Sequence, residues 1–287
     1  MNRAVMTSTT SSTYDFFLPI CAKIWRIRFG YEPLIFFVGT PEEWSSGHRK
    51  VVFDEIVKEK YPIEWLGHVE GVDDSIISMS IRQHAPALSW LDPSDLMLVA
   101  DIDLWPINKE FWAPHDTNKN ELAIRYSDMY EGGKYCAIGP CMSIANWREV
   151  MGLIVGDPVG SMMKSFEDGG LRELVKFQKE NPMAEGVLWF FDEITTTRRI
   201  VGSRFASNFL PMNVPYQEGR LCKNTWPDKI TASKYLDAHC PRPGWSYENW
   251  KKIKDLLRQI LPSEFPWLDH YVVAYRKAGP SIGDPSV

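Results

Sequence analysis

Short apolar runs alternate with amphipathic stretches along most of this chain. The apolar runs predict buried strands, because continuous segments of about four to eight apolar residues are typical of parallel strands covered on both faces. Stretches in which apolar residues recur every three or four positions predict helices between them. The predicted strands cover residues 3–6, 33–39, 64–69, 96–105, 122–126, 137–144 and 201–210. The predicted helices cover residues 14–29, 75–91, 146–153, 161–181 and 246–261, with another from residue 46.

The opening of the chain reads as strand, helix and strand, which predicts a parallel sheet with a right-handed crossover. Gly30 is expected to end the first helix, and Ser246 to cap the last one. We therefore expect an α/β, Rossmann-like domain with a mostly parallel central sheet flanked by helices. Within it, we expect residues 1–110 to form one half, residues 111–245 a second half with a smaller subregion, residues 246–277 a closing helical segment, and residues 278–287 a frayed tail.

The stretch LMLVADIDLW, residues 96–105, changes from apolar residues to a pair of aspartates, Asp101 and Asp103. Unpaired charges are costly to bury, so carboxylates at the end of a buried strand need a reason. The carboxyl ends of the strands are where open α/β sheets place ligands. If the strand alternation continues, both carboxylates share a face and address one cation, of the hard type that oxygen ligands favour. The alternative is that the aspartates only turn the chain.

The segment between the first strand and the first helix is rich in hydroxyl groups, TSTTSST over residues 7–13. Backbone N–H groups and side-chain donors at the start of a helix suit an anion or a nucleotide. The alternative is a cluster of residues that cap the helix.

Composition excludes several classes of protein. The chain has 287 residues, of which 44% are hydrophobic and 24% charged, so it is a globular and not a disordered protein. A net charge of −5 without a long basic run argues against a nucleic-acid partner. No run of about 18 apolar residues predicts a membrane span. The five cysteines form no C-x-x-C pair, so we expect reduced thiols in a soluble, cytoplasmic protein.

Taken in order, these motifs resemble the GT-A class of nucleotide-sugar-dependent glycosyltransferases. The resemblance covers roughly residues 3–260, and each motif is short, so the order and spacing carry it. The pieces are the first strand with residues 7–10 and Tyr14, a helix bearing Arg82, the hydrophobic D-x-D, a strand at 135–144 with Trp147, a W-F-F-D-E segment at 189–193, and H-x-P-x-P-G at 239–244.

The resemblance implies that residues 1–110 bind the nucleotide-sugar and residues 111–245 the acceptor, and it implies a role for each matching residue. Thr7, Ser8, Thr9 and Tyr14 would contact the base and ribose. Arg82 would neutralise a phosphate or fix the D-x-D loop, since a guanidinium suits that geometry. Asp101 would face the ribose or the metal, with Ile102 beside it in the nucleotide site, and Asp103 would bind the metal. His239 would complete the metal site, although its loop, HCPRPGW, departs from the H-x-x-G pattern of retaining members. Arg242 would bind the leaving diphosphate.

Asp192 and Glu193 stand where the class often holds a carboxylate near the acceptor or the reacting sugar. Such a group takes the proton of the acceptor hydroxyl in an inverting enzyme, or stabilises charge on the sugar in a retaining one. The alternative is that they cap a helix. Trp189 and Trp245 are candidates for packing against sugar faces.

The implied reaction moves a sugar from a UDP- or GDP-sugar to a hydroxyl of a glycan, protein or small molecule. It implies Mn²⁺ or Mg²⁺ as cofactor, and the His239 loop favours retention. A haloacid-dehalogenase-type phosphatase also follows a strand with D-x-D, but it requires Thr or Val soon after, where this chain has Leu104 and Trp105. A nucleotidyltransferase requires a Gly-rich basic loop that residues 7–13 lack. A non-catalytic nucleotide-sugar-binding module is the third alternative.

Overall fold

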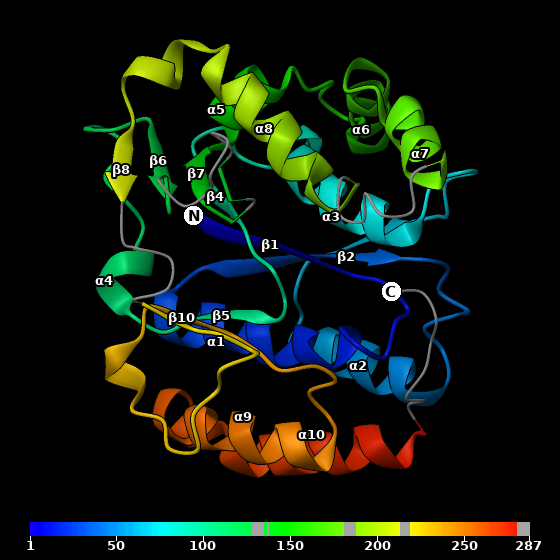
Figure 1. The fold of residues 1–287 in the computed structure, drawn as a ribbon, viewed down its shortest axis with the longest axis vertical. Coiled ribbons are helices and arrows are strands. Elements are labelled where there is room, and N and C mark those ends of the chain that lie inside the picture. Colours follow the sequence, from blue (N-terminus) through cyan, green and yellow to red (C-terminus); the bar gives the residue numbers. More distant parts are fainter. Residues whose placement is uncertain (128–134, 137, 181–187, 213–218, 280–287) are drawn as a thin grey trace. The chain divides into compact units, whose positions relative to one another are not determined.

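The computed structural model of the protein describes residues 1–127, 135–136, 138–180, 188–212 and 219–279. It is an α/β structure with a seven-stranded, mostly parallel sheet in the order β3-β2-β1-β4-β7-β6-β8, together with a second sheet in the order β5-β10-β9 (Figure 1). The predicted fold class is therefore confirmed. By internal contacts the chain divides into two compact units. Unit 1 comprises Met1–Val5, Val69–Val99 and Pro114–Pro215, and unit 2 comprises Met6–His68, Ala100–Ala113 and Tyr216–Val287.

The strands of the larger sheet are short and mostly buried. Their bounds are β1 Asn2–Ser8, β2 Glu32–Val38, β3 Ile63–Leu66, β4 Leu96–Val99, β6 Leu122–Arg125, β7 Pro140–Ser143 and β8 Leu210–Met212. The pairs β1–β4, β2–β3 and β6–β8 are parallel, whereas β7 runs antiparallel to both β4 and β6. All four residues of β4 are buried, as a continuous apolar run predicts.

Among the described residues, unit 1 contains the helices α3 Asp74–His84, α5 Ile144–Met151, α6 Pro158–Asp168, α7 Leu171–Glu180 and α8 Phe191–Val201. The buried indole of Trp147 on α5 donates a hydrogen bond to the carbonyl of Met97 on β4, 3.0 Å away. Arg148, next along the helix, donates to the carbonyls of Pro86 and Leu88. These contacts fix α5 both to the sheet and to the turn that follows α3.

Unit 2 contains α1 Leu18–Phe29, α2 Gly47–Lys58, the short α4 Lys109–Trp112, α9 Tyr247–Ile260 and α10 Phe265–Lys277. Its small sheet consists of β5 Leu104–Pro106, β9 Arg220–Leu221 and β10 Asp237–His239. A buried ion pair joins Arg220 to Asp237, with two nitrogen–oxygen distances of 2.7 and 3.0 Å. The pair fixes β9 to β10, which carries His239.

Most predicted helices are confirmed, with ends shifted by a few residues. Gly30 ends α1 with φ of +67°, in the left-handed region that suits glycine. Ser246 caps α9, where its hydroxyl accepts from the N–H of Asn249. The predicted break at 169–170 separates α6 from α7. Parts of two predictions, residues 137 and 181, and the tail from residue 280, lie outside the described residues.

Two predictions about strands are wrong. Residues 201–210 form no strand, because the end of α8 and a 3₁₀ turn at Arg204–Ser207 occupy them and β8 begins only at Leu210. The strand at 96–105 is not continuous either. β4 ends at Val99, and the N–H of Leu104 donates to the carbonyl of Asp101, 3.2 Å away, so the D-x-D residues form a turn. Strand alternation therefore cannot be used to place the two carboxylates on one face.

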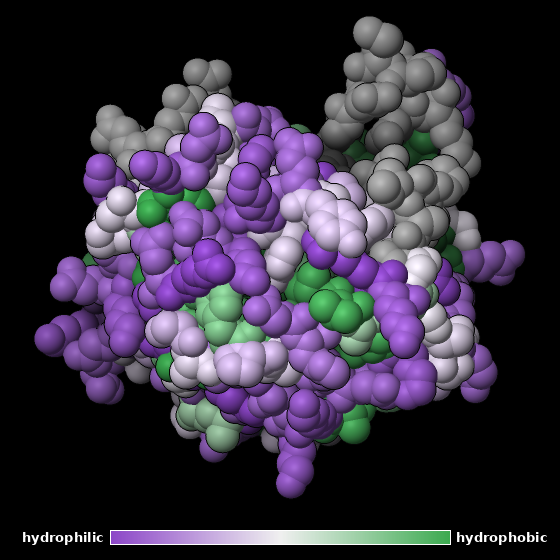
Figure 2. Space-filling view, turned by 90° about the horizontal axis from the view of Figure 1, so that it is seen from below, coloured by the Kyte–Doolittle hydropathy of each residue, from purple (hydrophilic) through white to green (hydrophobic). Residues whose placement is uncertain are grey.

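Figure 2 shows a mainly hydrophilic face with small hydrophobic areas. In the part of the chain that the structure describes, no helix is both long and apolar enough to cross a membrane. The five cysteines are thiols, as predicted.

Candidate active site

The D-x-D turn of unit 2 is held in place by hydrogen bonds to its backbone carbonyls. The carbonyl of Asp101 accepts from the thiol of Cys21 on α1, and that of Ile102 accepts from the indole of Trp105 at 2.9 Å. The carbonyl of Asp103 accepts from the N–H of Cys240, 2.7 Å away. Three supports from separate parts of unit 2 therefore fix the turn and the direction of its side chains.

The carboxylate of Asp103 is the centre of a small cluster. His239 lies opposite Leu104 in the antiparallel β10–β5 pair, which brings its ring beside the turn. Nε2 of His239 lies 3.2 Å from Oδ2 of Asp103, and Nε of Arg242 lies 3.5 Å from the same oxygen. Asp103 is only 7% exposed, so these neighbours, and not water, determine the environment of its charge.

Arg242 also contacts Tyr14. The centre of its guanidinium lies 4.7 Å from the centre of the Tyr14 ring, a cation–π arrangement. Burial lowers the pKa of Arg242 from its usual value. Four residues that the resemblance assigned separately, to ribose, metal and diphosphate, are therefore neighbours in unit 2.

The hydroxyl-rich segment that follows β1 is fixed by side chains from three other parts of unit 2. The indole of Trp245 donates to the carbonyl of Ser12 at 2.9 Å, and the hydroxyl of Tyr275 on α10 donates to Asp15 at 2.5 Å. His48 on α2 lies 3.3 Å from the other oxygen of Asp15. Trp245 is buried, so the residue predicted to pack against a sugar anchors the loop instead.

The predicted base and ribose contacts differ in accessibility. Thr7 and Ser8 at the end of β1 are buried, and Ser8 donates its hydroxyl to the carbonyl of Thr9. The hydroxyl of Thr9 accepts from the N–H of Ser11. Thr9 and Tyr14 are half-buried. Thr9 and Tyr14 are therefore better placed than Thr7 and Ser8 to meet a ligand with their side chains.

The remaining predicted residues belong to unit 1, where two of them meet. Nη2 of Arg82 on α3 lies 3.4 Å from Oδ2 of Asp192 on α8, and both side chains are buried. Oδ1 of Asp192 accepts from the N–H of Glu193, and both acids stand in the first turn of α8. The helix begins at Phe191, two residues before the start at Glu193 that capping by Asp192 would require, but acids in this turn match the positive end of the helix dipole. The side chain of Trp189 lies outside the described residues.

His84 on α3 is a further buried titratable group of unit 1. Its Nδ1 lies 2.8 Å from the carbonyl of Ser80, and its Nε2 lies 2.8 Å from the hydroxyl of Ser165 on α6. Burial lowers its pKa to about 4, so the ring is neutral near pH 7. The ring therefore ties α3 to α6.

The predicted metal ligands are only partly brought together. Among the described residues, no three His, Cys, Asp or Glu side chains form a group that could hold a metal ion, so Asp101 does not complete a set with Asp103 and His239. The Asp103 and His239 donors do fit a shared ion. Two ligand atoms about 2.2 Å from one metal and at right angles lie about 3 Å apart, close to the 3.2 Å seen here.

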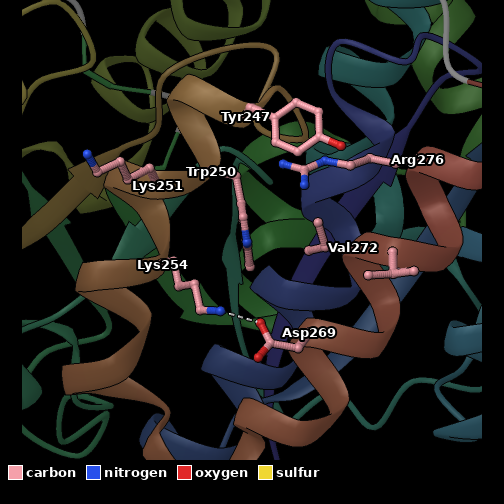
Figure 3. Close-up of a pocket in the computed structure, with 8 residues that line it drawn as sticks. Tyr247, Trp250, Lys251, Lys254, Asp269, Val272 and Arg276 are labelled. Carbon is pink, nitrogen blue, oxygen red and sulfur yellow. Dashed lines mark hydrogen bonds and ion pairs between the residues drawn. The ribbon is translucent and has the colours of Figure 1, made fainter.

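Sequence reasoning missed the residues that support the site. Cys21 and Trp105 look like ordinary core residues, and only their contacts reveal a role. A pocket of about 370 Å³ in the groove between α9 and α10 was also missed (Figure 3). In Figure 3 Tyr247 lies beside Arg276, and Lys254 is paired with Asp269. None of the predicted site residues lines this pocket.

Comparison with known proteins gives only similar structures. No family model and no curated protein match the sequence. The galactosyltransferase LgtC, solved in complex with donor and acceptor sugar analogues, has a TM-score of 0.45 at 11% identity, covering 92% of this chain and 96% of that one. The glycosyltransferase GlyE of Streptococcus pneumoniae TIGR4 is similar in its apo form, with a TM-score of 0.41 at 12% identity, and in a second structure, with 0.39 at 11%. In both cases 95% of this chain and 64% of GlyE are covered.

Proposed function

We propose that this chain is a glycosyltransferase that moves a sugar from a nucleoside-diphosphate sugar to a hydroxyl acceptor. The observation that carries the proposal is the cluster around Asp103. A nearly buried carboxylate with a histidine at 3.2 Å and an arginine at 3.5 Å combines two donors that can share a divalent metal with a cation suited to phosphate. An aromatic ring and a hydroxyl-rich loop lie in the same unit.

Each residue of the cluster has a proposed task. Asp103 and His239 hold the divalent cation, Mn²⁺ or Mg²⁺, and Asp101 faces the ribose. When bound, the cation stabilises the negative charge that builds on the departing diphosphate. Arg242 binds the diphosphate, and Tyr14 packs against the ribose or the base.

The acids of unit 1 are the proposed catalytic residues. Asp192 or Glu193 accepts the proton of the acceptor hydroxyl in an inverting reaction, or stabilises charge on the sugar in a retaining one. We favour retention, as the His239 loop suggests. Arg82 holds Asp192 in place through their ion pair.

The test is a binding and turnover screen on the purified full-length chain. We expect one UDP- or GDP-sugar to raise the melting temperature only with Mn²⁺ present, because a ligand that binds the native state stabilises it. The same donor should release nucleoside diphosphate slowly in water and faster with a hydroxyl acceptor. Asp103→Asn should abolish both effects, whereas Asp116→Asn, a change at an exposed aspartate, should leave them intact.

The two other functions give different results. Steady hydrolysis of p-nitrophenyl phosphate without any nucleotide-sugar would support a haloacid-dehalogenase-type phosphatase. Donor binding that is unchanged in Asp103→Asn, without turnover in either protein, would support a non-catalytic binding module. Either result would overturn the proposal.

A further inference from the structure

Two cationic or potentially cationic groups, His239 and Arg242, face a single carboxylate oxygen in unit 2. Oδ2 of Asp103 is the oxygen that lies 3.2 Å from His239 and 3.5 Å from Arg242. We propose that Arg242 is an internal counter-cation. It forms an ion pair with the carboxylate of Asp103 while no ligand is bound, and this ion pair breaks when a divalent cation and a nucleoside diphosphate bind together. This inference rests on the proposed function, and it makes metal and nucleotide binding strongly cooperative.

Because Asp103 is buried, its negative charge requires a counter-charge at all times. A carboxylate that is 7% exposed is unfavourable unless it is paired, and the cost of removing the partner of a buried pair is large. Arg242 keeps its charge at all ordinary pH values, unlike a histidine. It therefore neutralises Asp103 when no metal is present.

The same arrangement opposes binding of a metal alone. A divalent cation at Oδ2 of Asp103 would stand close to the guanidinium, and two positive charges a few ångströms apart in a partly buried site repel strongly. The metal must displace Arg242 from the carboxylate. The displaced cation then needs a new anionic partner.

A diphosphate provides that partner. The ion pair to Asp103 involves Nε of Arg242, and the Tyr14 contact involves the face of the guanidinium. Neither contact takes up the N–H groups of the two terminal nitrogens, which suit a phosphate. Tyr14 can thus keep hold of the guanidinium while it exchanges a carboxylate for a phosphate.

The coupling between the two binding equilibria must be reciprocal. Nucleotide should therefore raise the affinity for the metal by the same factor as the metal raises the affinity for nucleotide. Removing the counter-cation should therefore act in opposite directions on the two ligands. Arg242→Gln should bind Mn²⁺ alone about tenfold more tightly than the parent, since the competing charge is gone. It should bind UDP or GDP with Mn²⁺ more weakly, and the coupling between the two ligands should nearly disappear.

The experiment measures free Mn²⁺ by electron paramagnetic resonance during titration of the full-length protein, with and without UDP or GDP. Arg242→Lys retains a positive charge and should keep weak Mn²⁺ binding. Arg258→Gln, at an exposed arginine of α9, is the matched control and should behave as the parent. Melting curves check that each variant is folded.

The outcomes separate this inference from the proposed function. If Asp103→Asn loses Mn²⁺ binding and Arg242→Gln binds Mn²⁺ alone no more tightly than the parent, the counter-cation role is wrong while the proposed metal site is supported. If Asp103→Asn leaves Mn²⁺ binding unchanged with nucleotide present, the metal site itself is wrong, and the inference is overturned with it. Tighter Mn²⁺ binding in Arg242→Gln together with lost coupling supports the counter-cation.

Discussion

Nη2 of Arg82 lies 3.4 Å from Oδ2 of Asp192, although 110 residues separate them in the sequence. The resemblance gave them different partners, a phosphate or the D-x-D loop for Arg82 and the acceptor or sugar for Asp192. In the structure each is a partner of the other, and both are buried. The pair connects α3 to α8 and so has a structural task that does not depend on any ligand.

This pair gives a prediction about stability. Arg82→Met and Asp192→Asn should each lower the free energy of unfolding by about 3–5 kcal/mol, because each breaks a buried ion pair by removing one of its two members. The exposed pair of Arg199 and Asp168, 2.8 Å apart and also involving α8, is the control. Arg199→Met should cost less than about 1 kcal/mol. Urea titrations measure both, and equal costs for the two arginines would contradict the prediction.

His84 gives a prediction about pH. Its pKa is about 4 in the folded protein and 6.5 in a model peptide, so the unfolded chain takes up the proton first as the pH falls. Stability from this group is fully present above pH 6.5 and is lost as the pH falls towards 4. The loss amounts to about 3 kcal/mol, because each pKa unit corresponds to about 1.4 kcal/mol.

The difference between two variants isolates this effect. His84→Gln should be less stable than the parent at pH 7.5, with a smaller gap at pH 4.5, as measured by urea titration at each pH. His270→Gln, at an exposed histidine of α10, should follow the parent at both pH values. A constant gap for His84→Gln across this range would mean that the ring does not stay neutral on folding.

Local signals in the sequence account for most of the fold. Apolar run length identified β4, and capping chemistry identified both the end of α1 at Gly30 and the start of α9 at Ser246. These features depend on neighbouring residues alone, so one sequence suffices to find them. The mostly parallel sheet followed from the order of the elements.

Features that depend on distant residues were not predicted. β5 and β10 are three residues long, and each exists because it pairs with a segment about 130 residues away, as the opposed residues His239 and Leu104 do. The turn at Asp101–Leu104 looked like continued strand because its residues have the right alternation. Within the site, the joining of Asp103 with His239 was expected, whereas the contacts of Arg242 with both Asp103 and Tyr14 required the tertiary structure.

Trp245 provides a test of the loop that follows β1. Trp245→Phe removes the N–H that donates to the carbonyl of Ser12. We expect a loss of about 0.5–1.5 kcal/mol in stability, since the buried carbonyl of Ser12 loses its donor at 2.9 Å and keeps the more distant hydroxyl of Tyr275, 3.4 Å away. We also expect weaker binding of UDP or GDP with Mn²⁺. Trp226→Phe is the control, because the buried indole N–H of Trp226 has no hydrogen-bond partner within the described residues. Calorimetric melting and nucleotide titration measure the two effects, and equal responses from both tryptophans would argue against a role for the Ser12 contact.

Tyr14 tests whether the ring that contacts Arg242 belongs to the nucleotide site. Tyr14→Ala removes the cation–π contact, which is worth about 0.5–2 kcal/mol, so UDP or GDP should bind with Mn²⁺ about 2- to 30-fold more weakly. Tyr14→Phe keeps the ring and should bind nucleotide with an affinity within about twofold of the parent if the ring contact and not the hydroxyl matters.

Tyr247→Ala is the matched control, since the exposed Tyr247 ring also lies under an arginine, Arg276, at 4.1 Å. Isothermal titration should show unchanged nucleotide affinity for Tyr247→Ala. Weakened binding in Tyr14→Phe equal to that in Tyr14→Ala would assign the effect to the phenol hydroxyl and remove the reason for placing the guanidinium of Arg242 between Tyr14 and the diphosphate.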